Sequence, residues 1–410
     1  MTTRHILTRD SYLLLAARGL RMFSYGFLSV VLALYLSGLG FSVIQIGVLF
    51  TVALAGGAVV TGGVSIFANR WGRRTILIAS SILMALGGIA LATGRFPLML
   101  IFAALATLSP TAQEIGPFQS LEQAALSETS IDPSHVMPYA WYNLVGYLAV
   151  AVGALVAGVV PAALQGAGWS ALEAQRALVW AFSVIGLILA GLYLPLSPSI
   201  EGQRQRSPRH LLGLHRSRGI VLRLTALFGV DALAGGLIVQ SLVAYWFHQR
   251  FGIGLAVLGP LFFGTNLLSA LSSLVAAALA ARVGLLNTMV FTHLPSNVLL
   301  GLIPFMPTWP VAAAVLLARH ALSQMDVPTR QAYTMALVAP EERVAAAGLT
   351  NAVRPAAASL APAISGIAFQ AAANGLPFIL AGGIKILYDL ALWSMFRRAS
   401  IVQHDRDATQ

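Results

Sequence analysis

The sequence predicts an all-α polytopic membrane protein, and three observations lead to this fold class. First, 58% of the 410 residues are hydrophobic and only 10% are charged, whereas about a quarter of the residues in soluble domains are charged. Second, twelve apolar runs reach the roughly 20 residues that a helix needs to cross a bilayer. Third, these runs are continuous, whereas the strands of a membrane β-barrel alternate over about ten residues.

The predicted helices follow one another along the whole chain. The first begins after Arg9 and is too long for the apolar core of a signal peptide, so we expect it to stay in the protein. The predicted ranges are 11–36, 43–69, 75–94, 97–125, 137–164, 176–195, 219–247, 255–281, 286–305, 309–335, 343–370 and 375–396.

The arginines are distributed unequally between the two sides of these helices. With twelve spans both termini lie on one side, and sixteen loop and tail arginines fall there, against Arg95, Arg176 and Arg250 on the other. Because positive residues are retained in the cytoplasm during insertion, we expect both termini to be cytoplasmic and the protein to lie in the inner (plasma) membrane. The net charge of +11 is therefore assigned to membrane topology, and no nucleic-acid partner is expected.

A polar, basic interval after the sixth helix divides the chain into two halves that repeat. Five residues of the first half recur as the same residue type 212 positions later, and these are Gly40, Gly47, Phe50, Arg70 and Gly72. Two more, Asn143 and Gly158, recur 208 positions later. Two repeats of the same orientation imply a pseudo-twofold axis along the membrane normal. The predicted organisation is an N-terminal six-helix bundle, a cytoplasmic basic linker, a C-terminal six-helix bundle and a cytoplasmic tail, at 1–195, 196–218, 219–396 and 397–410.

The turn between the second and third helices carries a motif. Residues 65–74 read SIFANRWGRR, and this resembles the Gly-x-x-x-Asp-Arg-x-Gly-Arg-Arg loop of the major facilitator superfamily. Ser65 and Asn69 replace the glycine and the aspartate of that motif. The matching residues are Arg70, Gly72, Arg73 and Arg74.

The resemblance covers essentially the whole chain and implies a function. It implies two pseudo-symmetric six-helix bundles that move a solute by alternating access. It also implies that Asn69 faces the cytoplasmic end of helix 11 as part of a latch, where it has no charge to pair with an arginine. A helix 5 signature of the exporter subgroup, a Gly-Pro step, is missing from residues 146–161.

Helices 1 and 5 place polar groups inside the membrane, where each one is a candidate functional group because charge is costly there. Arg18, Arg21 and Tyr25 are spaced by three and four residues, which puts them on one helical face. Tyr142 and Asn143 lie in an aromatic stretch of helix 5. We expect these five residues to contact the substrate.

Helix 4 contains three acidic residues. Glu114 is the first candidate for a proton-carrying carboxylate, because burial disfavours the charged form of a carboxyl group and so allows it to bind a proton. The alternative is a structural acid that is solvated or bonded to Arg18. Glu122 and Glu128 lie nearer the cytoplasm, and we expect them to be solvated or to act in a latch.

Helix 10 carries a polar stripe. Arg319, Ser323, Asp326 and Arg330 follow one another at spacings of four, three and four residues on one face, and Pro328 is expected to loosen the helix between them. Arg319 and Ser323 are substrate-binding candidates, and Asp326 is a proton-coupling candidate. The alternative for Asp326 is a self-satisfied i,i+4 pair with Arg330, which we expect to be a gating or structural residue near the cytoplasm.

Helices 7, 9, 11 and 12 add further ionisable residues. Asp231 is the third proton-coupling candidate, and Arg354, near the start of helix 11, is a gating candidate. Lys385 and Asp389 are four residues apart, which predicts a neutralised pair on a supporting helix. His293 is expected to be a satisfied core histidine.

These observations predict a monomeric secondary transporter for a small organic solute, driven by protons, surrounded by membrane lipid, and with efflux slightly favoured. The alternatives are an importer or facilitator of a nutrient such as a vitamin or organic anion, and a non-transporting receptor on a transporter fold. No catalytic nucleophile and base stand at a usable spacing, so we do not expect an enzyme. No cofactor is expected, and the absence of cysteine and of a His-x-x-x-His pattern gives no support for a metal site.

Overall fold

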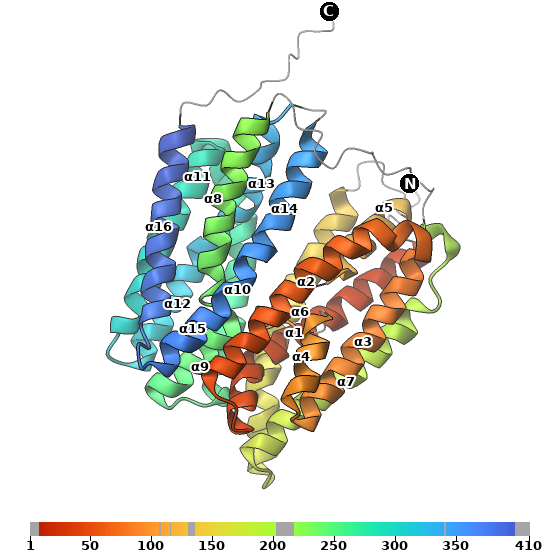
Figure 1. The fold of residues 1–410 in the computed structure, drawn as a ribbon, viewed down its shortest axis with the longest axis vertical. Helices are drawn as coiled ribbons and strands as arrows, with labels where there is room; N and C mark the ends of the chain where they lie inside the picture. Colours follow the sequence, from red (N-terminus) through yellow and green to blue (C-terminus); the bar gives the residue numbers. More distant parts are fainter. Residues whose placement is uncertain are drawn as a thin grey trace, which may run out of the picture. The chain divides into compact units, whose positions relative to one another are not determined.

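The computed structural model describes residues 8–105, 108–114, 116–129, 136–201, 217–339 and 342–397 (Figure 1). Side chains are described throughout these ranges except at residues 65–70, 127, 129, 136–137, 140 and 344. Every regular element within the described ranges is a helix, which confirms the predicted fold class. Ten of the described helical segments are long and apolar enough to cross a membrane.

In the described part of the chain, the first half forms seven α-helices and a short 3-10 helix. The first helix is capped by the Thr8 side chain, and a capping box of Ser170 and Glu173 begins the seventh. The elements are α1 (Arg9–Gly38), α2 (Val43–Trp71), α3 (Arg73–Thr93), α4 (Phe96–Ala104), α5 (Phe118–Thr129), α6 (Val136–Gly166), α7 (Ala171–Tyr193) and η1 (Pro198–Glu201).

The second half forms nine α-helices and another 3-10 helix. They are α8 (Arg218–Gly236), α9 (Gln240–Phe251), α10 (Leu255–Val283), α11 (Leu285–Leu302), η2 (Ile303–Phe305), α12 (Trp309–Ser323), α13 (Asp326–Leu337), α14 (Arg343–Ser359), α15 (Ala361–Gln370) and α16 (Leu376–Phe396).

Four predicted helices are wrong in one respect, because each is divided into two pieces. The range 97–125 became α4 and α5, 219–247 became α8 and α9, 309–335 became α12 and α13, and 343–370 became α14 and α15. A proline cannot donate to the carbonyl four residues earlier and its ring crowds that carbonyl. Pro328 therefore cannot donate a hydrogen bond to the carbonyl oxygen of Gln324, and α12 ends at Ser323, just before Gln324. Between α4 and α5, Gly116 has a φ of 88°, a left-handed conformation that favours glycine.

The chain forms two compact units that interleave the sequence. Unit 1 comprises residues 1–205, 238–267 and 362–374, and unit 2 comprises residues 206–237, 268–361 and 375–410. Unit 1 therefore contains the first half of the chain together with α9, the beginning of α10 and most of α15. The predicted division into bundles at the linker stays a prediction.

Unit 1 is built around α1. Within its most apolar window, 83% of the residues are buried, more than in the other described spans. The helix packs against α6 and α7, which run beside it in Figure 1, and against α9. Such a central position explains why the helix has no wide polar face.

Residues of the predicted repeat meet one another inside unit 1. Gly158 of α6 packs against Gly259 of α10, and the repeat partners of these residues, Gly366 and Gly47, pack against each other between α15 and α2. A Cβ atom on Gly158 would lie 2.7 Å from the carbonyl oxygen of Leu255, and one on Gly366 would lie 2.7 Å from that of Val43. The two close helix contacts are therefore reciprocal, as pseudo-twofold symmetry requires.

A further contact joins equivalent residues of the two repeats. Ser241 Oγ donates to the carbonyl oxygen of Ser29 at 2.6 Å, and these residues are 212 positions apart. Gln240 Nε2 also donates to Ser29 Oγ at 2.8 Å. These bonds fix the beginning of α9 against the middle of α1.

Unit 2 has an aromatic and aliphatic core between α8, α11, α13 and α16. Its buried members include Phe228, Met289, Tyr333, Tyr388 and Leu392. This core packs beside the ionisable residues of the same helices and excludes water from that side of them.

Candidate functional site

Unit 1 contains a fully buried ion-pair cluster centred on Arg21 of α1. Arg21 donates to Glu122 Oε1 and Oε2 at 2.8 and 2.6 Å and to Glu114 Oε1 at 2.8 Å. It also donates to the Tyr193 hydroxyl at 2.9 Å, and Tyr142 donates to Glu122 Oε2 at 2.7 Å. Arg21 and Glu122 have no solvent-exposed side-chain surface. Each charge is thus matched by an opposite charge, as burial requires.

Arg18 completes this cluster from one turn earlier on α1. It forms a salt bridge with Glu114, and its guanidinium carbon lies 4.5 Å from the centre of the Tyr142 ring. A Cβ atom on Gly146 would come within 2.8 Å of Arg18 Nε, so the glycine makes room for the arginine. Two arginines and two glutamates leave the cluster without net charge.

The acidic residues of the predicted fourth helix are positioned differently from the prediction. Glu114 does not lie within a helix, because it falls in the segment between α4 and α5. It is bonded to Arg18, as in the alternative given above, and to Arg21. The expectation that Glu122 is solvated or part of a latch is wrong, because α5 carries its side chain into the buried cluster. Glu128 is 41% exposed and lies 3.8 Å from Arg73.

The remaining substrate candidates of unit 1 differ in burial. Tyr142 is fully buried and belongs to the cluster. Tyr25 is also buried and packs near the Phe182 ring, with 6.3 Å between centroids. Asn143 is exposed on α6. The structure thus groups Arg18, Arg21 and Tyr142, and it leaves the other two outside the cluster.

Unit 2 contains a second buried cluster, centred on Asp231 of α8. Lys385 Nζ lies 2.5 Å from Asp231 Oδ1, and Arg354 Nη1 lies 3.1 Å from Oδ2. Arg330 Nη1 lies 3.6 Å from the same Oδ2 and 2.6 Å from Asp326 Oδ2. The predicted alternative of an i,i+4 pair between Asp326 and Arg330 is therefore present, and the pair is joined to the Asp231 group.

Two residues predicted as a neutralised pair have other partners. Lys385 binds Asp231, so the predicted pairing with Asp389 is wrong. Asp389 instead lies 2.9 Å from His293 Nδ1 and accepts a hydrogen bond from Asn297 Nδ2 at 2.9 Å. On the other side of the imidazole, Nε2 lies 4.0 Å from Asp231 Oδ1. His293 thus lies between two carboxylates, which the sequence analysis did not foresee.

Arg319 and Ser323, the substrate candidates of α12, are buried without full hydrogen bonding. Arg319 is 9% exposed, and its Nη1 lies 3.3 Å from Nε2 of the His320 ring. Within the described part of the chain, Arg319 Nε and Ser323 Oγ have no hydrogen-bond partner. Asp231 and Asp326 act on this arginine electrostatically, but no described carboxylate lies within the 4.0 Å of an ion pair.

The motif of the loop after α2 is described only in part. The side chains of Asn69 and Arg70 lie outside the described residues, so the latch is not seen. Gly72 has a φ of 84°, which explains a glycine at this turn. Glu201 Oε2 and Oε1 accept from the backbone nitrogens of Arg73 and Arg74 at 2.6 and 3.1 Å.

The two arginine side chains of this motif clamp neighbouring helices. Arg73 Nη1 donates to the carbonyl oxygens of Ile200 and Ala124 at 2.7 and 3.2 Å. Arg74 donates to the carbonyl oxygen of Leu194, at the end of α7. The motif therefore holds α3 to α5, α7 and η1, and these contacts are all within unit 1.

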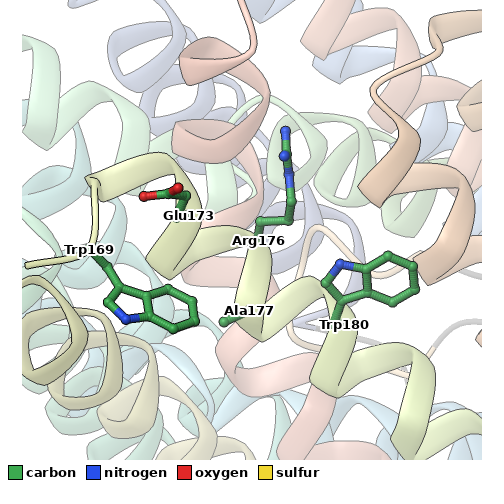
Figure 2. Close-up of a pocket in the computed structure, with 5 residues that line it drawn as sticks. All are labelled: Trp169, Glu173, Arg176, Ala177 and Trp180. Atoms are coloured by element: carbon green, nitrogen blue, oxygen red, sulfur yellow. The ribbon is translucent and has the colours of Figure 1, made fainter.

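A surface pocket of about 390 Å³ lies at the first turns of α7. In Figure 2 the rings of Trp169 and Trp180 stand on either side of Ala177, and Glu173 and Arg176 complete the lining. None of the residues of the two buried clusters lines it. Half-exposed tryptophans at a helix end are typical of the membrane interface, so we assign this pocket to the lipid boundary.

The described residues provide no group of three or more histidine or acidic side chains that could hold a metal ion. In the described part of the chain, the candidate functional residues are therefore those of the two buried clusters. Unit 1 is balanced in charge. The unit 2 cluster has four cations, Arg319, Arg330, Arg354 and Lys385, against three aspartates, which leaves one positive charge when His293 is neutral.

Comparisons with known proteins agree with this arrangement of helices. A sequence model of the Major Facilitator Superfamily matches residues 14–323. An uncharacterized membrane protein of Saccharomyces cerevisiae is 27% identical over 422 residues, which covers 95% of this chain and 94% of the yeast protein.

Two solved structures share the fold. The crystal structure of the nucleoside transporter NupG has a TM-score of 0.74 at 16% identity and covers 95% of this chain and 100% of its own. The inward open conformation of the xylose transporter XylE from E. coli has a TM-score of 0.69 at 16% identity, with 97% of each chain covered. At this identity the likeness concerns the fold alone.

Proposed function

This chain belongs to the Major Facilitator Superfamily, and we propose that it is a secondary transporter that moves a small organic anion across the membrane by alternating access. The family and the fold make it a multi-pass membrane transporter of some solute. The class of solute, the coupling to protons, the direction and the cellular membrane are the steps that we propose beyond this.

The observation that carries the anion assignment is the unmatched charge of Arg319. A buried cation without a paired carboxylate is costly, and an anionic ligand lowers that cost by forming charge-assisted hydrogen bonds. Ser323 lies one turn further along α12, and its hydroxyl also lacks a partner among the described residues. A carboxylate group of the solute suits this arginine and this hydroxyl together.

Neutral solutes are the competing class. A nucleoside and xylose are the solutes named for two structural neighbours, and both would bind through hydroxyl groups and ring stacking. Neither would neutralise Arg319. The unit 1 cluster offers no excess charge, so it does not favour an anion over a neutral solute.

The proposal includes a proton gradient as the energy source and the inner (plasma) membrane as the location, with both termini in the cytoplasm. The asymmetry of loop arginines supports the orientation. The coupling candidates Glu114, Asp231 and Asp326 are all buried carboxylates. Base rates for chains with this loop motif slightly favour efflux, and the sign of the accompanying proton movement decides the direction.

Transport by purified protein in liposomes tests the proposal. Radiolabelled benzoate, nicotinate and succinate represent the anions, and uridine and D-xylose represent the neutral solutes. We expect at least one carboxylate to move, and we expect Arg319→Gln to reduce its transport by about tenfold or more, because a charge-assisted hydrogen bond contributes about 1.5–3 kcal/mol.

The matched control is Arg223→Gln, which removes an exposed arginine of α8 and should transport like the wild type. Movement of a neutral solute alone, or a wild-type rate in Arg319→Gln, would contradict the anion assignment. A carboxylate that raises the melting temperature without crossing the membrane would instead indicate a receptor.

A further inference from the structure

The imidazole of His293 lies between two carboxylates of the buried unit 2 cluster, and histidine is the side chain that ordinarily gains and loses a proton near neutral pH. It comes from α11 and meets Asp389 of α16 on one ring nitrogen and Asp231 of α8 on the other. The His293 side chain is 6% exposed and Asp389 is not exposed at all. Three helices that are distant in the sequence thus position one imidazole between two carboxylates.

Asp389 differs from the other acids of the two buried clusters in the nature of its partners. Glu114 and Glu122 are bonded to arginine, Asp326 to Arg330, and Asp231 to a lysine and two arginines. The described partners of Asp389 are only His293 and the neutral amide of Asn297. When the imidazole is neutral, this carboxylate therefore has no cation in contact with it.

Protonation of the other acids in the two clusters would break a pair with a permanent cation. Loss of the charge of Asp326, for example, would leave Arg330 with only the 3.6 Å contact to Asp231. Such a loss is strongly unfavourable in a buried site. A proton that binds to His293 has the opposite effect, because it provides Asp389 with the counter-charge that it lacks.

We propose that His293 is the proton-binding residue of this transporter and that Asp389 is the carboxylate that positions and stabilises its charged form. Nδ1–H donates to Asp389, the incoming proton adds to the lone pair of Nε2, and it leaves from Nε2 to water. The proposal rests on the proposed transport function, and it names the residue at which the driving ion binds.

The location of the charge connects proton binding to the solute. Protonated His293 places a positive charge 4.0 Å from Asp231, where it competes with Arg354, whose side chain is 27% exposed. A proton and an organic anion together leave the net charge of the unit 2 cluster unchanged. Each therefore favours the binding of the other, which makes the two ligands travel together. An inward proton gradient would then drive uptake of the anion, in place of the efflux that the loop motif slightly favours.

Other titratable and charged groups lie near this site. The helices packed on α11 are α12, α13 and α16, and α8 reaches the ring through Asp231. Their titratable and charged residues near the site are Arg319, His320, Asp326, Arg330, Tyr333, Lys385, Tyr388 and Asp389, with Asp231 from α8 and Arg354 from α14.

A nitrogen NMR titration of the histidine rings tests the proton site directly. The full chain, labelled with ¹⁵N-histidine in lipid nanodiscs, is measured between about pH 5 and pH 9, and the His293 signal is identified by its loss in His293→Gln. We expect this ring to change from charged to neutral within that range. Asp389→Asn should lower the midpoint by about one pH unit or more, because it removes the carboxylate that favours the charged ring.

Asp10→Asn, which neutralises a buried aspartate of unit 1, is the matched control and should leave the midpoint in place. A His293 ring that keeps one charge state from pH 5 to pH 9, or whose midpoint is the same in Asp389→Asn, would overturn the proposal.

A flux experiment then separates this proposal from the transport function. In wild-type liposomes, inward movement of the carboxylate identified above should carry protons in the same direction, and a pH-sensitive dye inside should report acidification. In His293→Gln the proton signal should be lost and the remaining flux should no longer vary with pH. Absence of all flux in the wild type refutes the transport function alone, whereas proton-coupled flux in His293→Gln refutes His293.

Discussion

At the scale of the residue, this protein pairs nearly every buried charge within its own unit. Arg21 is matched by two glutamates and assisted by two tyrosines, and Asp231 is shared by three cations. Candidates could be identified from the sequence because charge in a membrane span is rare. Their partners could not be identified in this way. Lys385, for example, does not pair with Asp389 one turn away but binds Asp231 on another helix. The burial of Glu122 was not predicted, because its place near the cytoplasmic end of a predicted helix favoured a solvated acid.

Substitution of Glu122 tests how much the unit 1 cluster stabilises the fold. Glu122→Gln keeps the size of the side chain but removes the counter-charge of Arg21, so we expect a loss of about 3 kcal/mol in the free energy of unfolding. Unfolding of purified protein by sodium dodecyl sulfate, followed by tryptophan fluorescence, measures this loss. Glu173→Gln, at an exposed position of α7, should be much milder, and equal losses would show that burial of the pair is unimportant.

At the scale of the element, some helix ends and breaks can be predicted from the local sequence and others cannot. Pro328 predicted a loosened helix, and the structure ends α12 five residues before it. The breaks after Gly236 and around Leu360 were not predicted, because hydropathy stays high through them and only packing selects them. The N-terminus of α3 was readable as a turn at Gly72, but its capping acid, Glu201, comes from far along the chain.

Removal of this capping charge should weaken α3. In Glu201→Gln one anion is lost from the positive end of a helix dipole, where it accepts two backbone hydrogen bonds, and we expect a cost of about 1 kcal/mol. The same unfolding assay provides the measurement. The control is Glu128→Gln, whose 3.8 Å contact with Arg73 is half exposed and should contribute less than about 0.5 kcal/mol. If the two variants are equally stable, the cap has no role.

At the scale of the whole molecule, the internal repeat is visible as reciprocal contacts inside unit 1. The glycines found by their spacing in the sequence are the residues at which helices of the two repeats touch, Gly158 with Gly259 and Gly366 with Gly47. Close helix contacts of this kind tolerate no side chain. Alternating access requires such contacts to separate and form again, so they are positions at which the conformational equilibrium can be shifted.

A side chain at Gly158 should force α6 and α10 apart at this contact. In Gly158→Val the new atoms collide with backbone of α10, with Leu255 O 2.7 Å and Gly259 Cα 3.1 Å from the first carbon. The chain has no cysteine, so Ser29→Cys, at a buried position, provides a single reporter. We expect its reaction with a water-soluble maleimide to become roughly tenfold faster in the double variant, since a shift of about 1.4 kcal/mol changes the population by that factor.

Gly191→Val is the control for this experiment, because nothing lies within 4 Å of a Cβ atom at that position. A similar acceleration there, or none in Gly158→Val, would show that the glycine contact does not control access to Ser29.

The sequence by itself determined that this chain enters a membrane, where its apolar segments lie, that its halves repeat and which residues are exceptional enough to carry function. These properties depend on composition, periodicity and spacing, which are local or additive along the chain. Only the tertiary structure decided that His293 lies between two carboxylates, that Lys385 binds Asp231 and that Arg319 has no carboxylate partner among the described residues. Partner choice depends on the rotation of each helix about its own axis against helices up to a hundred or more residues away, and this rotation is set by packing.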